Sequence, residues 1–270
     1  MVTLTLENYE LLRNEITRLR ALKEVFEGLA NCDSKGKKMF SVVTKTWNPV
    51  TGCTHYCRYC WARKLAETKL KKSPKYRAGF EPGIHRDEFK VSFKPGELVF
   101  VSDMGDLFCG GIKDEWIDKV LNYIRKFPKT NFLLLTKNPQ RYKDFIRDMP
   151  SNVILGATIE TNEDELYRKQ HISYAPLPSI RYKAMKDINW YKKFISIEPI
   201  LDFNMGEFTK WIKEISPFMT YVGYDNYNNK LPEPPLQKTL SFIRKLSEIS
   251  LVVKKTIRPA WFEGLAAPVW

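Results

Sequence analysis

Hydrophobic and polar residues follow two different patterns along the chain. Near the N-terminus, apolar residues recur at spacings of three and four, which predicts an amphipathic helix over residues 7–29. These residues are Tyr9, Leu12, Ile16, Leu19, Leu22, Phe26 and Leu29. The polar run "NCDSKGKK" (31–38) then ends the pattern. We therefore predict an N-terminal helical extension over 1–38, which packs on the body of the protein or on a partner, and a main domain over 39–270.

Beyond residue 39, short apolar segments alternate with amphipathic ones. The segments that read as strands are 40–49, 97–103, 131–137, 152–160, 192–199, 219–225 and 250–257. The segments that read as helices are 62–72, 114–127, 140–149, 206–215 and 236–249. Strands that alternate with helices favour a parallel sheet, and strands that are apolar on both faces are typical of a sheet covered by helices. This pattern predicts an α/β fold, a partial (β/α)6 TIM-like barrel.

Polar groups gather at the end of six of these predicted strands. They stand in "SDMGD" (102–106), "TKNP" (136–139), "TIET" (158–161), "SIEP" (196–199), "YDN" (224–226) and "KKTIRP" (254–259). Because the carboxyl ends of parallel strands meet at one edge of the sheet, these groups are expected to form the rim of a single site.

The chain is basic and has no obvious membrane segment. Its 270 residues suit one large domain or two small ones, and it carries a net charge of +13. The excess is concentrated at 58–94, which holds 11 basic and 4 acidic residues. Such a surplus favours a polyanionic partner, although a solvated lysine-rich surface is the alternative. No apolar run approaches the roughly 20 residues of a membrane span, and the first residues do not resemble a signal peptide, so we expect a cytoplasmic protein.

Three of the five cysteines are crowded into "TGCTHYCRYC" (51–60), as Cys53, Cys57 and Cys60. In a reducing compartment such a cluster indicates metal binding more than disulfides. A structural zinc site would add His55 or a distant ligand, but zinc modules usually pair two separated C-x₂-C units, and the chain has no second pair. The other candidate is a 4Fe–4S cluster with one iron left open. Cys32 lies outside the motif.

The C-x₃-C-x₂-C spacing after the first predicted strand resembles that of the radical S-adenosylmethionine (SAM) enzymes. The run "WNPVTGCTHYCRYCWARK" (47–64) is similar to a phage-associated and archaeal branch of that superfamily, of unassigned function and distantly similar to spore photoproduct lyase, which repairs DNA. The similarity continues in "VFVSDMGDLF", "LLLTKNPQR", "ILGATIET", "FISIEPIL" and "LVVKK". The chain departs from it at "VGYDN" (222–226), where bacterial members usually have a glycine-rich strand end.

This resemblance implies a cofactor chemistry and roles for several residues. The open iron would bind the amino and carboxylate groups of SAM, and an electron from a reductase or another donor would lead to a 5′-deoxyadenosyl radical that abstracts hydrogen from the substrate. Tyr59 would lie beside the adenine, or else pack in the core. Ser102 and Asp103 would accept from the SAM amino group and Gly105 would let the backbone come close, unless Asp103 caps the next helix.

Further strand-end residues would bind SAM or substrate. Thr158 and Glu160 stand where the superfamily often contacts the ribose and carboxylate of SAM. Lys137 and Glu198 are lone charges after apolar strands, so they either pair with each other or bind cofactor and substrate groups.

Near the last strand end, Lys254, Lys255 and Arg258 would bind phosphate or form a solvated basic surface. Cys109 either returns a hydrogen atom to a substrate radical or acts as a small buried hydrophobe.

The sequence alone leaves the substrate class open. The basic segment and the aromatic residues Tyr56, Trp61, Tyr76 and Phe80 favour DNA or RNA, because lysine and arginine neutralise phosphates and aromatic rings stack on unpaired bases. A protein or peptide and a small molecule are the alternatives. The rival function from another class is a zinc-bearing, non-catalytic nucleic-acid-binding module.

Overall fold

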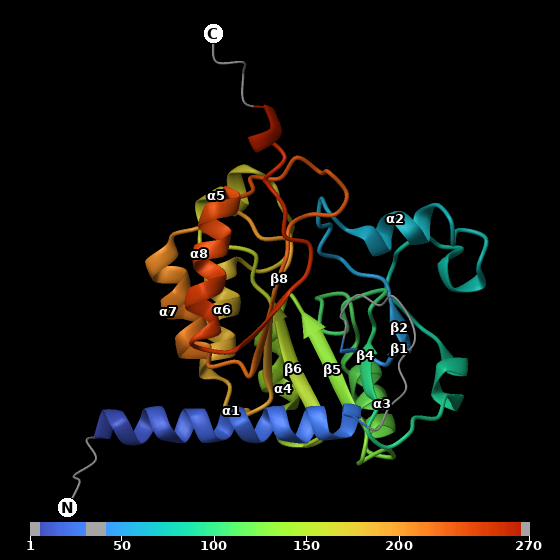
Figure 1. Cartoon of the computed structure of the whole chain (residues 1–270). Coiled ribbons are helices and arrows are strands. Elements are labelled where there is room, and N and C mark those ends of the chain that lie inside the picture. The colour runs from blue at the N-terminus through green and yellow to red at the C-terminus, as the bar shows by residue number, and fades with distance from the viewer. Residues whose placement is uncertain (1–5, 31–41, 266–270) are drawn as a thin grey trace, which may run out of the picture.

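The computed structural model describes residues 6–30 and 42–265, in which seven strands form one parallel sheet (Figure 1). The strands are β1 (Lys45–Trp47), β4 (Leu98–Val101), β5 (Asn131–Thr136), β6 (Val153–Thr158), β7 (Lys193–Ile197), β8 (Met219–Val222) and β9 (Leu251–Lys254). They lie side by side in chain order, and the sheet curls into a half-barrel. A small antiparallel pair, β2 (Val50–Thr51) and β3 (Gly83–Ile84), stands beside it.

Helices connect the strands of the sheet, and most of them cover its outer face (Figure 1). They are α2 (Trp61–Glu67), α3 (Asp114–Ile124), α4 (Tyr142–Phe145), α5 (Asp164–Lys169), α6 (Pro178–Asp187), α7 (Met205–Ile215) and α8 (Leu236–Ser247). Alternate strand residues such as Val99, Val101 and Leu134 enter one large core with Ile117 and Leu121 of α3. Burying an aliphatic side chain of this kind contributes about 1.5–3 kcal/mol, so this outer core is the main source of stability.

The predicted partial (β/α)6 barrel is confirmed, and the seven predicted strands are the seven strands of the sheet. The connection from β6 to β7 was predicted without helices, but it contains α5 and α6. Helix α6 buries Arg181, whose charge interrupts the apolar periodicity that would reveal the helix. None of the described helices combines the length and apolar character needed to cross a membrane.

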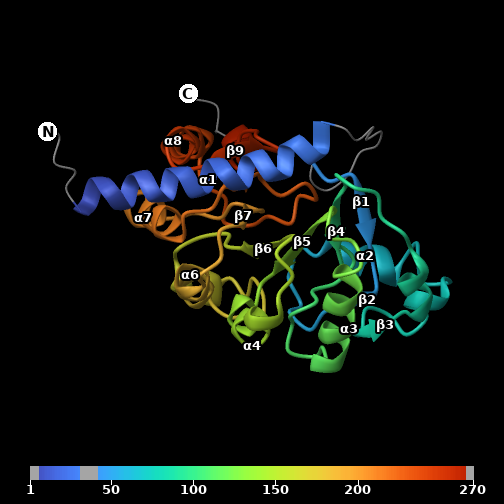
Figure 2. The same cartoon turned by 90° about the horizontal axis from the view of Figure 1, so that it is seen from below.

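The N-terminal helix α1 (Leu6–Ala30) lies across the end of the sheet at which the strands begin (Figures 1 and 2). Its second half packs Ala21 and Val25 against a core formed by the inner face of the strands, including Phe100 and Phe194. Glu24 forms an ion pair with Lys192 at 2.8 Å. Packing on the body is thus confirmed, while the boundary predicted at 38/39 lies outside the described residues.

The first half of α1 leaves Tyr9, Leu12, Ile16 and Leu19 exposed, so the two halves of the helix should differ in their effect on stability. Val25→Ala is expected to lower the free energy of unfolding by about 1–2 kcal/mol, because it removes buried methyl groups and leaves a small cavity. Leu12→Ala is the control and should change it by less than about 0.5 kcal/mol. Urea unfolding followed by circular dichroism measures both, and equal effects would mean that α1 is not docked.

Candidate active site

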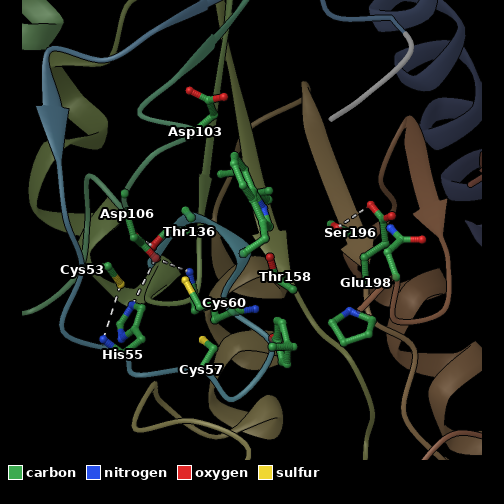
Figure 3. Close-up of a pocket in the computed structure, with 18 of the residues that line it drawn as sticks. Cys53, His55, Cys57, Cys60, Asp103, Asp106, Thr136, Thr158, Ser196 and Glu198 are labelled. Atoms are coloured by element: carbon green, nitrogen blue, oxygen red, sulfur yellow. Dashed lines mark hydrogen bonds and ion pairs between the residues drawn. The ribbon is translucent and has the colours of Figure 1, made fainter. Parts of the chain in front are cut away.

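A cavity of about 600 Å³ opens at the carboxyl ends of the strands, at the opposite end of the sheet from α1 (Figure 3). Its walls come from the cysteine loop, from the ends of the strands and from the segment after β8. Ten of the residues predicted for the site line it: Cys53, Cys57, Tyr59, Cys60, Asp103, Gly105, Lys137, Thr158, Glu198 and Lys255. Ser102, Glu160, Cys109, Lys254 and Arg258 do not belong to this lining.

Two glycines hold the cysteine loop against the end of β4. Gly52 has φ +84°, and a Cβ built on it would lie 2.2 Å from the carbonyl oxygen of Glu81. A Cβ on Gly105 would lie 2.8 Å from the carbonyl oxygen of Gly52. Gly105 therefore permits a close approach of the Gly52 backbone, while its role beside the SAM amino group stays a prediction.

The three motif cysteines point into the same cavity and form no disulfide (Figure 3). Cys60 also caps α2, because its Sγ accepts a hydrogen bond from the Arg63 amide at 3.3 Å. The Cys57 thiol donates to the hydroxyl of Ser173 at 3.3 Å. Burial raises the pKa of Cys57 and of Cys60. Burial thus disfavours the thiolate form of both side chains.

A buried histidine–aspartate pair, which the sequence did not reveal, stands beside Cys53. His55 Nε2 lies 3.1 Å from Asp106 Oδ2, and both side chains are buried. Asp106 also accepts from the Thr136 hydroxyl and from the Lys137 amide, at 2.6 and 2.8 Å. Burial alone would raise the pKa of Asp106, but the contact with His55, together with these hydrogen bonds, outweighs it and lowers the pKa.

Cys109 is fully buried, and its thiol neighbours that of Cys53. This contact lowers the pKa of Cys109 and raises that of Cys53, where burial acts in the same direction. Cys109 packs in the outer core with Phe108 and Ile112. Its position matches the predicted small buried hydrophobe, next to a motif cysteine and away from the cavity surface.

Glu160 is the centre of a buried ionic network rather than part of the cavity wall. Its carboxylate accepts from Arg181 Nη1 at 2.5 Å and from Lys137 Nζ at 2.8 Å. The Tyr59 hydroxyl donates to it as well. Burial opposes ionisation, but Arg181 and Lys137 outweigh it and lower the pKa of Glu160 to about 2. Lys137 also lies 5.2 Å from the centre of the Tyr59 ring.

Asp103 and Ser102 follow β4 but differ in what they face. The Asp103 carboxylate lines the cavity and accepts from Asn48 Nδ2 at 2.6 Å. Burial raises the pKa of Asp103. Ser102 has φ +57°, and among the described residues its buried hydroxyl has no hydrogen-bond partner.

The remaining charges form ion pairs that the sequence did not assign. Glu198 lies 3.2 Å from Lys255 Nζ, so Lys137 and Glu198 do not pair with each other. Burial raises the pKa of Glu198, although Lys255 partly offsets this effect. Arg258 donates two hydrogen bonds to Glu233, at 2.9 and 2.8 Å, which leaves its charge balanced. Lys254 is exposed at the edge strand β9.

The fold matches that of solved structures of spore photoproduct lyase. The chain is similar to a cysteine-to-serine variant of that enzyme with a TM-score of 0.57 at 11% identity, over 82% of this chain and 81% of the other. It is similar to the complex with dinucleoside spore photoproduct with a TM-score of 0.53 at 10% identity, over 82% of this chain and 66% of the other.

A variant with bound AdoMet and dinucleoside spore photoproduct gives a TM-score of 0.53 at 12% identity, over 80% of this chain and 65% of the other. The chain thus spans about two thirds of the length of the two ligand-bound enzymes, and at these identities the likeness concerns the fold.

The sequence itself defines the family. Residues 38–212 match the family described as "Protein of unknown function (DUF5131)", and the chain belongs to that family. No curated protein has a matching sequence.

The ionic network around Glu160 should contribute to the free energy of unfolding. Arg181→Met should lower the free energy of unfolding by about 3 kcal/mol, because it removes the main counter-charge of a buried carboxylate. Adding Glu160→Gln should recover about 1 kcal/mol or more, since the uncompensated charge is then gone. Arg168→Met, at an exposed ion pair on α5, is the control and should cost less than about 1 kcal/mol. Urea unfolding measures these changes. If the loss in the double variant equals the sum of the losses in the two single variants, the network is not coupled.

Proposed function

We propose that the protein is a radical SAM enzyme. Cys53, Cys57 and Cys60 would hold a 4Fe–4S cluster, at which reductive cleavage of SAM supplies a 5′-deoxyadenosyl radical for hydrogen abstraction from a substrate. The observation that carries this proposal is that the three thiols line one cavity at the carboxyl ends of a half-barrel. The fold likeness to spore photoproduct lyase, one structure of which contains AdoMet, supports it.

The donor set in the cavity suits an iron–sulfur cluster better than structural zinc. Three soft thiolates are the ligands that such clusters prefer, whereas a structural zinc ion needs four ligands in a closed shell. Cys53, His55 and Asp106 place ligand atoms within 4.8 Å of one another, but the Asp106 carboxylate is already hydrogen-bonded by His55, Thr136 and two backbone amides. A cavity of about 600 Å³ also has room for a cofactor the size of SAM.

The charges on the cavity wall are arranged to bind a zwitterion such as the methionine part of SAM. Asp103 would accept from its ammonium group, and Lys137 would bind its carboxylate, because Arg181 already balances the Glu160 charge. Glu198 would accept from the ribose hydroxyls, and Thr158 could contact either group. In this proposal Glu160 orients Tyr59 and Lys137 and does not touch SAM. The bound substrate would complete the enclosure and exclude water.

For the substrate we infer a nucleic acid. The lobe formed by residues 64–77 exposes Lys64, Lys69, Lys71, Lys72 and Arg77. No ion pair engages any of these five side chains in the part of the chain that the structure describes, so their charge remains available to phosphates. The complex of spore photoproduct lyase with a dinucleoside is consistent with this substrate class.

Iron content tests the cluster. Anaerobically purified protein should be brown and contain about four irons per chain. Cys57→Ala should lose most of the iron and all SAM cleavage after dithionite reduction, whereas the control Cys109→Ala should keep its iron, because Cys109 lies outside the cavity lining. Colourless wild-type protein with one zinc per chain would instead support the non-catalytic zinc module.

A salt series tests the nucleic-acid substrate. The affinity for short single- and double-stranded DNA and RNA should fall as salt rises, because bound lysines release counterions. A triple variant should reduce the slope of log affinity against log salt by about one to two units. It combines Lys69→Gln, Lys71→Gln and Lys72→Gln. The matched control replaces the exposed Lys183, Lys210 and Lys213 of α6 and α7 and should leave the slope unchanged. No binding of wild-type protein at low salt would remove this hypothesis.

A further inference from the structure

The cysteine loop has a second, outward-facing side. Along the loop, Cys53, His55, Cys57 and Tyr59 line the inner cavity, whereas the intervening Tyr56 and Arg58 line a separate cavity of about 600 Å³. We call this second cavity the outer groove; its wall also includes Arg168, His171, Ser173 and Tyr174. The loop is thus a partition with the motif thiols on one side and the outer groove on the other.

This partition is one side chain thick at Cys57. Ser173 lines the outer groove, and its hydroxyl lies 3.3 Å from the Cys57 sulfur, which lines the inner cavity. Backbone hydrogen bonds hold the two segments together: the Arg58 amide donates to Ile172 and the Tyr174 amide to His55, at 3.0 and 2.7 Å. An electron crossing here would travel a short path through packed and hydrogen-bonded atoms.

The outer groove combines positive charge with exposed aromatic surface. The Arg58 guanidinium donates to the backbone carbonyls of Gln170 and Asn229, at 2.9 and 3.4 Å, so these contacts leave its charge unbalanced. Arg168 is exposed beside it and pairs with Glu165 at 2.8 Å, and the exposed His171 also borders the groove. Tyr174 is 81% exposed and packs edge-on against Tyr56, with ring centres 5.9 Å apart. Exposed tyrosines with a basic rim are typical of a docking surface for an acidic protein.

We propose that the outer groove is the docking site of an acidic one-electron carrier protein that reduces the cluster past Ser173. The proposal rests on the proposed function, which requires an electron donor. One electron passes from the reduced carrier to the oxidised cluster; the carrier is oxidised, and at this step no bond forms or breaks and no proton moves. Small contact areas and charge steering are usual in such transient redox encounters.

A nucleic acid also carries negative charge, but the geometry favours the carrier. A substrate must reach the inner cavity to lose a hydrogen atom there, and the outer groove lies on the other face of the loop. A carrier needs proximity to the cluster and no access to the cavity. The thin wall at Ser173 provides that proximity.

The test compares two reductants on the cluster-loaded enzyme. The probes are a reduced flavodoxin, as an acidic one-electron carrier, and dithionite, which needs no docking surface. Arg168→Glu with Tyr174→Ala should slow cluster reduction by flavodoxin about tenfold or more at low salt, because it reverses a rim charge and removes an exposed anchor. Reduction by dithionite should stay within about twofold of wild type, since neither residue lines the inner cavity. Lys210→Glu on α7 is the charge-matched control and should behave as wild type with both reductants.

Binding gives a readout independent of activity. Calorimetric titration with oxidised flavodoxin should show an affinity that weakens with salt and about tenfold or more with the paired substitution. The proposal would be overturned if the paired substitution changed neither the affinity nor the rate of reduction by flavodoxin. It would also be overturned if Lys210→Glu lowered both quantities as much as the paired substitution does. Loss of single-stranded DNA affinity at an unchanged reduction rate would assign the outer groove to nucleic acid and also overturn it. If wild-type protein fails to cleave SAM with dithionite, that result counts against the proposed enzyme function. The calorimetric titration then still shows whether the outer groove binds the carrier.

Discussion

The carboxylate of Glu160 connects four segments of the site, and its complete burial makes the contacts necessary. An ionised carboxylate without exposed surface is costly unless counter-charges and hydrogen-bond donors surround it. Here they come from Arg181 on α6, from Lys137 after β5 and from Tyr59 in the cysteine loop. Because Tyr59 stands between Cys57 and Cys60, a shift of the loop would leave the carboxylate without one of its donors. The network therefore fixes the loop to the barrel by electrostatics as well as by packing.

The half-barrel imposes a second constraint, since its inner face cannot be left open to water along its whole length. At the end where the strands begin, α1 and the inner strand residues fill the space with Ala21, Val25 and Leu133. At the other end the space stays open as the cavity. Phe100 and Leu135 touch both regions, so they form the floor of the site. The depth of the cavity is thus set by how far the apolar filling extends from α1.

The alternation of apolar and amphipathic segments and the polar strand ends predicted the barrel and the common rim, and the cysteine spacing predicted a shared site for the three thiols. These features are local: a short apolar segment, a polar residue after it, a loop with fixed cysteine spacing. The pairing of charges was not predictable in this way. Lys137 meets Glu160 and not Glu198, and His55 meets Asp106, 51 positions away, because the curl of the sheet decides which strand ends face each other. Helix α6 escaped detection for a related reason, since its buried Arg181 serves the network.

The spacing of the cysteine motif follows from the shape of its loop. Cys53, His55 and Cys57 line the inner cavity, and between them Tyr56, whose φ is +49°, turns to the outer groove. The chain then turns as α2 begins: the Cys60 amide donates to the Cys57 carbonyl at 3.1 Å, and Cys60 is the N-cap. Across that turn a separation of three brings the third thiol to the same side. Tyr56 and Arg58, which stand between the thiols in the sequence, face the outer groove. In the proposed function, the same loop would therefore hold the cluster and present the surface through which it is reduced.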